Sequence, residues 1–268
     1  MWVTDKLSVK VRKFLLFIFM MLGAMVLLYF LTYENWVKET APIENVATTT
    51  LPASVTISSQ PDKKVSEVKK NLTPLKLLSP WKRAMTTLFW VGEPADADNA
   101  YITNTESYWD EKWQNHYGGL DNPDCRNGYK PCEFTPKENP FYFALPYGEY
   151  DANGNLKPSA MRVPWAKKGG SQLLKNRWIA VKHGSAVCYA QWEDVGPNGE
   201  DDFAYVFGKA EPVNTFGEKA GLDASPALWK CLQMSDNGVT DWAFVDGALV
   251  PPGPWKDIVT TSGTSWGS

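Results

Sequence analysis

The sequence predicts a mainly β domain that follows one N-terminal apolar helix. Three observations support this fold class. Residues 14–33 carry no charged side chain. Beyond residue 81, short segments rich in β-branched and aromatic residues alternate with turn signals, a pattern typical of strands. Near the C-terminus, the one well-marked helical pattern is short. We therefore expect a single globular β domain behind an apolar segment and a linker.

Residues 14–33 (FLLFIFMMLGAMVLLYFLTY) predict a transmembrane signal anchor, because 20 residues at about 1.5 Å per residue match a hydrocarbon core of roughly 30 Å. The preceding residues 1–13 are basic, which favours a cytoplasmic N-terminus and an exported C-terminal domain, periplasmic or extracellular. A cleaved signal peptide is the main alternative and also implies export. A lipoprotein is disfavoured because no cysteine precedes Cys125.

Residues 34–80 predict a flexible linker. From residue 41 onward they are rich in Thr, Ser, Pro and Lys, with short apolar stretches that bury too little surface to offset the entropy of ordering. Residues 81–268 then form the exported domain, which is long enough for one hydrophobic core.

Composition excludes several classes of partner. The formal net charge is −3 and no basic stripe is present, which argues against nucleic acid. We expect no metal and no cofactor: the chain has 2 His and no CxxC spacing, and the acidic run of residues 200–202 is interpreted as a solvated turn and not a calcium loop. The 13 Trp and 11 Tyr point instead to packed aromatic cores or to platforms that stack on sugars.

The 4 cysteines predict two disulfides in an oxidising compartment, although four cysteines allow three pairings. Cys125 and Cys132 lie in one loop rich in Gly, Pro and Asn and are positioned to close it. Cys188, on an expected strand, and Cys231, on an expected helix, would make the second bridge.

The expected strands include residues 177–183, 186–194 and 241–246. A helix is expected over residues 226–234, with Ser225 as N-cap and Pro226 at the first helical position. A second helix is expected over residues 107–116, where Trp109 and Trp113 fall at i and i+4, a spacing that favours packing over ligand binding.

Two acidic residues lie at element boundaries, where a side chain can be held rigidly. Asp194 ends an expected strand and opens the turn DVGP, and Asp223 directly precedes the capped helix. Asp194 alone fits an Asx-turn, and Asp223 alone fits the electrostatics of a helix N-terminus.

Together with residues 144–148 (ALPYG), these positions form an ordered set. LPYG, then a strand ending in DVGP, then LDAS before a short helix resembles the rare lipoprotein A (RlpA) type of six-stranded double-psi β-barrel, whose motifs read LPFG, NDRGP and IDLS. Expansins and family 45 glycoside hydrolases share this barrel. The resemblance covers residues 140–248 and places Asp223 like the aspartate of the hydrolases' HFD motif.

The sequence departs from that pattern at three places. Tyr142 stands where the RlpA-type histidine is expected, and Val195 replaces the arginine of DRGP. The first-strand base of the family 45 hydrolases would fall near residues 89–91, which hold no carboxylate, and Glu93 follows two residues later. These gaps weaken the case for a full hydrolytic acid/base pair.

The resemblance still implies lytic transglycosylase chemistry, in which one aspartic acid protonates the glycosidic oxygen and its conjugate base helps the sugar's own 6-hydroxyl to attack. We assign Asp223 or Asp194 to this role, Asp223 by preference, with a pKa raised by burial. If both act in an inverting hydrolase, their carboxyl groups should lie ~6.5 to 9.5 Å apart.

Candidate substrate-binding residues are Tyr142, Trp192, Tyr189, Trp90 and Glu93. Tyr189 and Trp192 should face opposite sides of an unbroken strand. Residues 98–139 match nothing in the resembling families, and we expect them to form a lid or side wall.

Three functions remain open. The first is an enzyme that cleaves peptidoglycan or another β-linked polysaccharide. The second is a non-catalytic glycan-binding module similar to expansins. The third is a structural or protein-binding barrel whose motifs only define turns.

Overall fold

The computed structural model describes residues 76–97, 99–166 and 173–263. The described residues all belong to one compact unit, which falls within residues 68–268. The predicted anchor at residues 14–33 and most of the predicted linker lie outside the described residues. Across the described ranges, no helix is both long enough and apolar enough to cross a bilayer.

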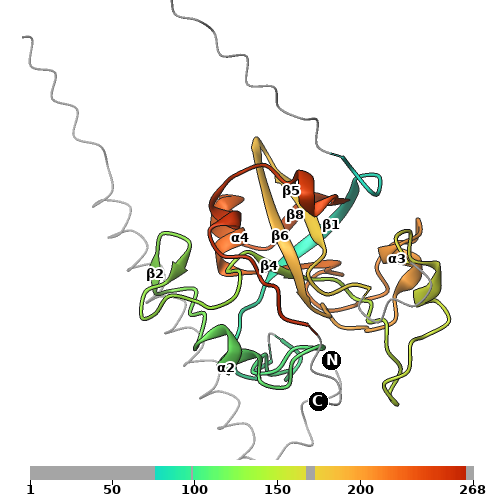
Figure 1. The fold of residues 1–268 in the computed structure, drawn as a ribbon, viewed down its shortest axis with the longest axis horizontal. Helices are drawn as coiled ribbons and strands as arrows, with labels where there is room; N and C mark the ends of the chain where they lie inside the picture. The colour runs from blue at the N-terminus through green and yellow to red at the C-terminus, as the bar shows by residue number, and fades with distance from the viewer. Residues whose placement is uncertain (1–75, 98, 167–172, 264–268) are drawn as a thin grey trace, which may run out of the picture. The chain divides into compact units, whose positions relative to one another are not determined.

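A closed β-barrel forms the centre of the described domain (Figure 1). Its strand order is β1-β7-β4-β6-β5-β8. The strands β1 and β7 are parallel, as are β4 and β6, and the remaining neighbours are antiparallel. Six strands thus close the barrel within the described residues: β1 (Lys82–Leu88), β4 (Tyr142–Ala144), β5 (Trp178–His183), β6 (Ala186–Asp194), β7 (Leu222–Ala224) and β8 (Gly238–Val245).

The expected strands are confirmed with small shifts: β5 and β6 match closely, and β8 begins three residues earlier than predicted. The domain also begins before residue 81, because Leu77 bridges Val245 and the amide of Leu78 donates to the carbonyl of Phe244 at 2.7 Å. The last residues assigned to the linker therefore pack on β8.

The helices around the barrel are short. The predicted helix at residues 226–234 is confirmed as α4 (Pro226–Cys231), but that at residues 107–116 is reduced to α2 (Trp113–Tyr117), which ends at Gly118 in the left-handed conformation. The remaining elements are the hairpin β2 (Arg126–Asn127) and β3 (Lys130–Pro131), α3 (Phe203–Val206), and the 3₁₀ turns η1 (Ala160–Arg162), η2 (Gly247–Leu249) and η3 (Pro254–Lys256).

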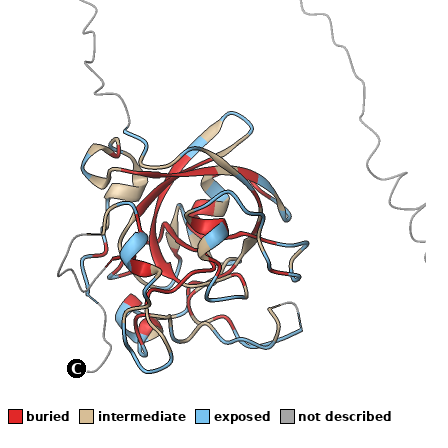
Figure 2. Ribbon diagram, turned by 90° about the vertical axis from the view of Figure 1, so that its right-hand side faces the viewer, coloured by how far each residue is buried: buried red, intermediate tan, exposed pale blue. Residues whose placement is uncertain are grey.

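The hydrophobic core fills the barrel interior, where the strands are largely buried (Figure 2). Phe143, Trp192 and Phe244 lie in this core, and the ring centroids of Phe143 and Trp192 are 5.8 Å apart. A second cluster lies on the outer face of β4, where Tyr142 contacts Phe89 of the segment after β1 and Trp113 of α2. Trp109 and Trp113 are each 1% exposed, which confirms that they are packed.

Ser225 ties α4 to the barrel. Its hydroxyl oxygen accepts from the amide of Leu228 at 3.2 Å, as an N-cap should, and donates to the carbonyl of Pro140 at 2.7 Å. It also accepts from the amide of Tyr142 at 3.2 Å. The predicted cap thus also fixes the start of α4 beside β4.

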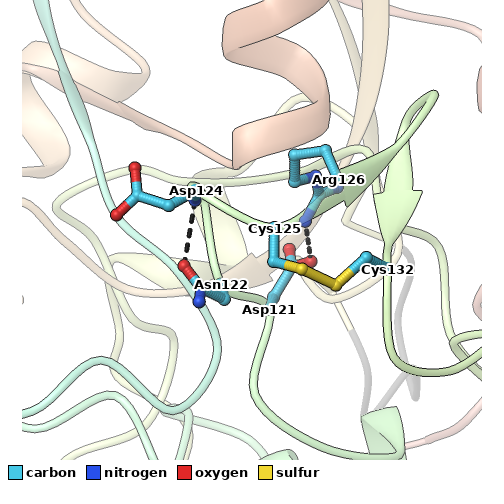
Figure 3. Close-up of a disulfide and its surroundings, with 6 residues drawn as sticks. All are labelled: Asp121, Asn122, Asp124, Cys125, Arg126 and Cys132. Carbon is cyan, nitrogen blue, oxygen red and sulfur yellow. Dashed lines mark hydrogen bonds and ion pairs between the residues drawn. A yellow bond between two sulfur atoms is a disulfide. The ribbon is translucent and has the colours of Figure 1, made fainter.

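Both predicted disulfides are present. Cys188 on β6 is bonded to Cys231 on α4, and Cys125 to Cys132 across the β2–β3 hairpin. In Figure 3 the disulfide between Cys125 and Cys132 lies beside the ion pair between Arg126 and the buried carboxylate of Asp121. The two disulfides close loops of different length.

Because a longer closed loop removes more entropy from the unfolded chain, we expect the two bonds to differ in stabilisation. Replacing Cys188 and Cys231 by Ala, which opens a separation of 43 residues, should lower the free energy of unfolding by about 4 kcal/mol. The Cys125→Ala, Cys132→Ala variant, with a separation of 7 residues, should lose about 2 kcal/mol. Urea unfolding followed by tryptophan fluorescence measures both, and an equal or reversed order would contradict the expectation.

Candidate functional site

A pocket of about 100 Å³ opens at one side of the barrel and is lined by three carboxyl groups, those of Glu93, Asp194 and Asp223. Its walls come from the end of β1, the loop that follows it, the turn after β6, residues 214–220 and β7. Both aspartates singled out from the sequence therefore lie in one pocket, and Glu93 joins them.

Strand register brings the two aspartates together. Ala144 on β4 pairs with Asp223 on one side and with Asp194 on the other, and Asp223 in turn pairs with Thr87 on β1. Side chains directly opposite one another across a ladder point to the same face, so these four share one face of the sheet. Two strand spacings put the α-carbons of Asp194 and Asp223 about 10 Å apart.

A β-bulge in β6 places the side chain of Asp194 on the same face as that of Asp223. Phe143 pairs with Trp192, but the next residue, Ala144, pairs with Asp194, which leaves Glu193 as the extra residue. Without it, Asp194 would follow the alternation of Trp192 and face the barrel interior. The extra residue turns Asp194 to the outer face that carries Asp223.

Asp223 is the most perturbed acid of the site. Burial raises its pKa to about 8, and the negative charges of Glu93 and Asp194 add to the rise. A hydrogen bond from the hydroxyl of Thr87 to Oδ1 acts in the opposite direction. The carboxylic acid form is therefore favoured at neutral pH.

Gly196, in the DVGP turn, lies against the other oxygen of Asp223. A Cβ at this position would stand 3.0 Å from Oδ2 of Asp223 and 3.7 Å from the Cβ of Ala144. The small residues at 144 and 196 thus let the turn approach the space between the two aspartates. This gives a physical reason for the glycine of the motif.

Asp194 is held by the main chain. Its Oδ1 accepts from the amide of Tyr108 at 2.7 Å, and 8% of the residue is exposed. Burial raises its pKa to about 7, against the lowering effect of backbone hydrogen bonds from Tyr108 and Val195. The aspartate is therefore fixed in orientation yet close to half-protonated at neutral pH.

Glu93 follows the turn after β1, in which its amide donates to the carbonyl of Trp90 at 3.0 Å. Its Oε2 accepts from the side-chain amide of Asn104 at 2.6 Å. Burial raises its pKa to about 7, and the hydrogen bond from Asn104 opposes that rise. The sequence placed a carboxylate two residues beyond the expected base position, and the turn brings it into the pocket.

Residues from the unmatched segment form part of this site. Asn99, Ile102 and Asn104 line the pocket, and the amide of Tyr108 binds Asp194. Residues 99–108 of the segment thus form one side of the pocket, and residues 109–139 do not line it.

The four aromatic residues predicted to bind substrate lie outside the lining of this pocket. Trp192 is fully buried in the barrel core, and Tyr189 is 7% exposed and packs on Trp255 at 4.9 Å between ring centroids. Tyr142 is 1% exposed, and its hydroxyl donates to Asp121 at 2.8 Å. Trp90 is partly exposed but does not line the pocket. The buried rings of Tyr142, Tyr189 and Trp192 offer no face to a sugar, and none of the four side chains lines this pocket.

Sequence reasoning missed Thr87, Asn104 and Phe216, which also line the pocket. Thr87 lies on a strand that pairs with β7, and Phe216 lies on a loop 7 positions before Asp223 in the sequence. No local motif marks them. Their role depends on pairings between distant segments.

The acidic run at residues 200–202 serves local structure. Asp202 caps α3 by accepting from the amide of Tyr205 at 3.1 Å, and Asp201 lies 3.2 Å from the ammonium group of Lys157. Within the described ranges, no group of three or more His, Cys, Asp or Glu side chains has a geometry that could hold a metal ion.

The site can donate and accept protons near neutral pH.

A scan against family models finds no match for this chain, and a search of curated proteins finds none either.

Replacing Thr87 by Val should raise the pKa of Asp223 further, because the lost hydroxyl stabilises the charged carboxylate. Carbon-detected NMR titration of the Asp223 carboxyl group measures the change, and Asp223→Asn identifies its resonance. Thr87→Ser keeps the hydroxyl and should titrate like the parent. A fall of the pKa in Thr87→Val would contradict this account.

Proposed function

We propose that this chain is a glycan-active protein of the cell envelope that cleaves peptidoglycan by acid/base catalysis, with Asp223 as general acid. One observation carries the proposal: three carboxyl groups with raised pKa values line the same pocket. Acids with pKa values near the working pH are suited to transfer protons in a transition state.

The arrangement of the barrel supports the resemblance to the RlpA-type double-psi fold. Six described strands close the barrel. β1 and β4 follow one another in sequence among the barrel strands but are separated in the barrel by β7, so the chain crosses over between them. The motif LPYG follows β4, DVGP begins on the last residue of β6, and LDAS begins on β7. We propose the double-psi topology as the finer description of this barrel.

The proposed reaction starts with Asp223 in its acid form. Its proton passes to the glycosidic oxygen as the bond to the anomeric carbon breaks, and positive charge develops on the sugar. The carboxylate of Asp194, oriented by the amide of Tyr108, lies on the same face to stabilise that charge. In the transglycosylase reaction, the sugar's 6-hydroxyl then attacks the anomeric carbon and loses its proton to the conjugate base.

Glu93 leaves a second outcome open for the same site. If its carboxylate takes a proton from water while Asp223 protonates the leaving group, the reaction is hydrolysis and the product has a reducing end. The closed 1,6-anhydro ring marks transglycosylation instead. The product therefore decides between the two mechanisms.

Peptidoglycan is proposed as substrate because the chain is expected to be exported and tethered close to a membrane through residues 14–33. The two disulfides suit an oxidising compartment. A chain that binds glycan without cleaving it would instead fit the expansin-like alternative, which the replacement of histidine by Tyr142 favours.

Incubation of the full-length chain with purified peptidoglycan should release muropeptides, with Asp223→Asn reducing the rate about 10²- to 10⁴-fold because the general acid is lost. Asp257→Asn, an exposed aspartate away from the pocket, is the matched control. Chromatography with mass spectrometry separates anhydro from reducing products. Equal rates for parent and Asp223→Asn would exclude Asp223 as the acid.

The rate of peptidoglycan cleavage should fall as the pH rises above about 8, because Asp223 then loses its proton. If Asp194 or Glu93 also acts as base, the rate should also fall as the pH drops below about 7, because these groups then become protonated. Initial rates from pH 5 to 10 measure both limbs, which report the coupled group of acids as a whole. A rate that keeps rising beyond pH 9 would contradict the assignment.

A further inference from the structure

The pocket around the three acids is small. Its volume of about 100 Å³ is below the roughly 300 to 1,000 Å³ of sites that enclose a whole drug-sized ligand. Further units of a glycan chain would have to rest on the surface around the pocket. The residues on its rim therefore decide how such a chain is held.

Two large apolar side chains stand exposed on that rim. Phe216 and Ile102 both line the pocket, and each is 48% exposed. They come from different loops, residues 214–220 and residues 99–104. The carboxyl groups of Asp223 and Asp194 line the same pocket and are buried. Exposed apolar side chains beside polar groups match a pyranose, whose ring faces carry C–H groups and whose edges carry hydroxyl groups.

The backbone that presents Phe216 is fixed. The amide of Phe216 donates to Oδ1 of Asn214 at 2.9 Å, and the side-chain amide of Asn214, which is 5% exposed, donates to the carbonyl of Ala220 at 3.0 Å. The amide of Ala220 closes the turn by donating to the carbonyl of Phe216 at 3.1 Å. The exposed ring therefore projects from a well-bonded loop.

The same loop rests on the strand that holds the acid. Gly217 has a φ of +51°, and a Cβ there would stand 2.9 Å from Cγ2 of Thr87. Thr87 is the residue whose hydroxyl donates to Asp223. The residue after Phe216 thus packs close to the threonine that donates to the proposed acid, with no room for a side chain between them.

We propose that Phe216 is the aromatic platform that stacks on a pyranose ring of the glycan beside Asp223, with Ile102 contacting the same chain. This inference rests on the proposed function for its substrate class but concerns binding and not the proton transfer. It gives Phe216 the role that the buried Trp192 and Tyr189 do not fill.

The test measures binding of soluble glycan strands, prepared by removing the peptides from peptidoglycan, to the full-length Asp223→Asn chain by calorimetry. Adding Phe216→Ala should weaken binding about three- to tenfold, as loss of one aromatic contact implies. With Phe216→Trp added instead, the affinity should stay within about twofold of that of the Asp223→Asn chain, because an aromatic ring is kept. Met161→Ala is the matched control, since Met161 is 47% exposed and does not line the pocket.

Phe216→Ala should fold normally, because the loop is held by main-chain atoms of residue 216 and by Asn214, and circular dichroism checks this. Unchanged binding in Phe216→Ala overturns the inference. If the parent cleaves no peptidoglycan but binding still depends on Phe216, the proposed catalysis fails and the platform stands. If no variant binds the strands, the inference about Phe216 fails, and the cleavage assay decides the proposed function separately.

Discussion

The pairing of Ala144 with two aspartates is the constraint on which the site depends. β4 has just three residues, yet its last one lies between Asp194 and Asp223 and sets their separation. The bulge at Glu193 turns Asp194 outward, and Ser225 fixes β4 against α4. A shift of β4 by one residue would move Ala144 to the inner face and separate the acids. The polar site thus depends on the register of a strand that carries no acid itself.

Local patterns were sufficient to predict several features. Alternation and turn signals marked β5 and β6, and the sequence SPALWK marked the capped start of α4. The ends of a strand and of a helix also pointed to Asp194 and Asp223, because such positions hold side chains rigidly. Both disulfides were predicted from the loop that contains Cys125 and Cys132 and from the remaining pair.

Other features could not be predicted locally. The alternation in β6 put Tyr189 and Trp192 on opposite faces, as observed, but it could not say that both faces are covered, one by the core and the other by Trp255. The predicted helix at residues 107–116 was wrong in most of its length, because the chain there turns to place the amide of Tyr108 on Asp194. Tertiary contacts outweighed helix propensity at this position.

The raised pKa values also have a consequence for the fold itself. Glu93, Asp194 and Asp223 bind protons more tightly in the folded chain than in the unfolded one, where acids of these types titrate near pH 4. Their contribution to the free energy of unfolding is fully present below about pH 4 and is lost as the pH rises through 7 to 8. The burial that raises these three pKa values thus makes their part of the stability of the barrel weaken as its surroundings turn from acidic to alkaline.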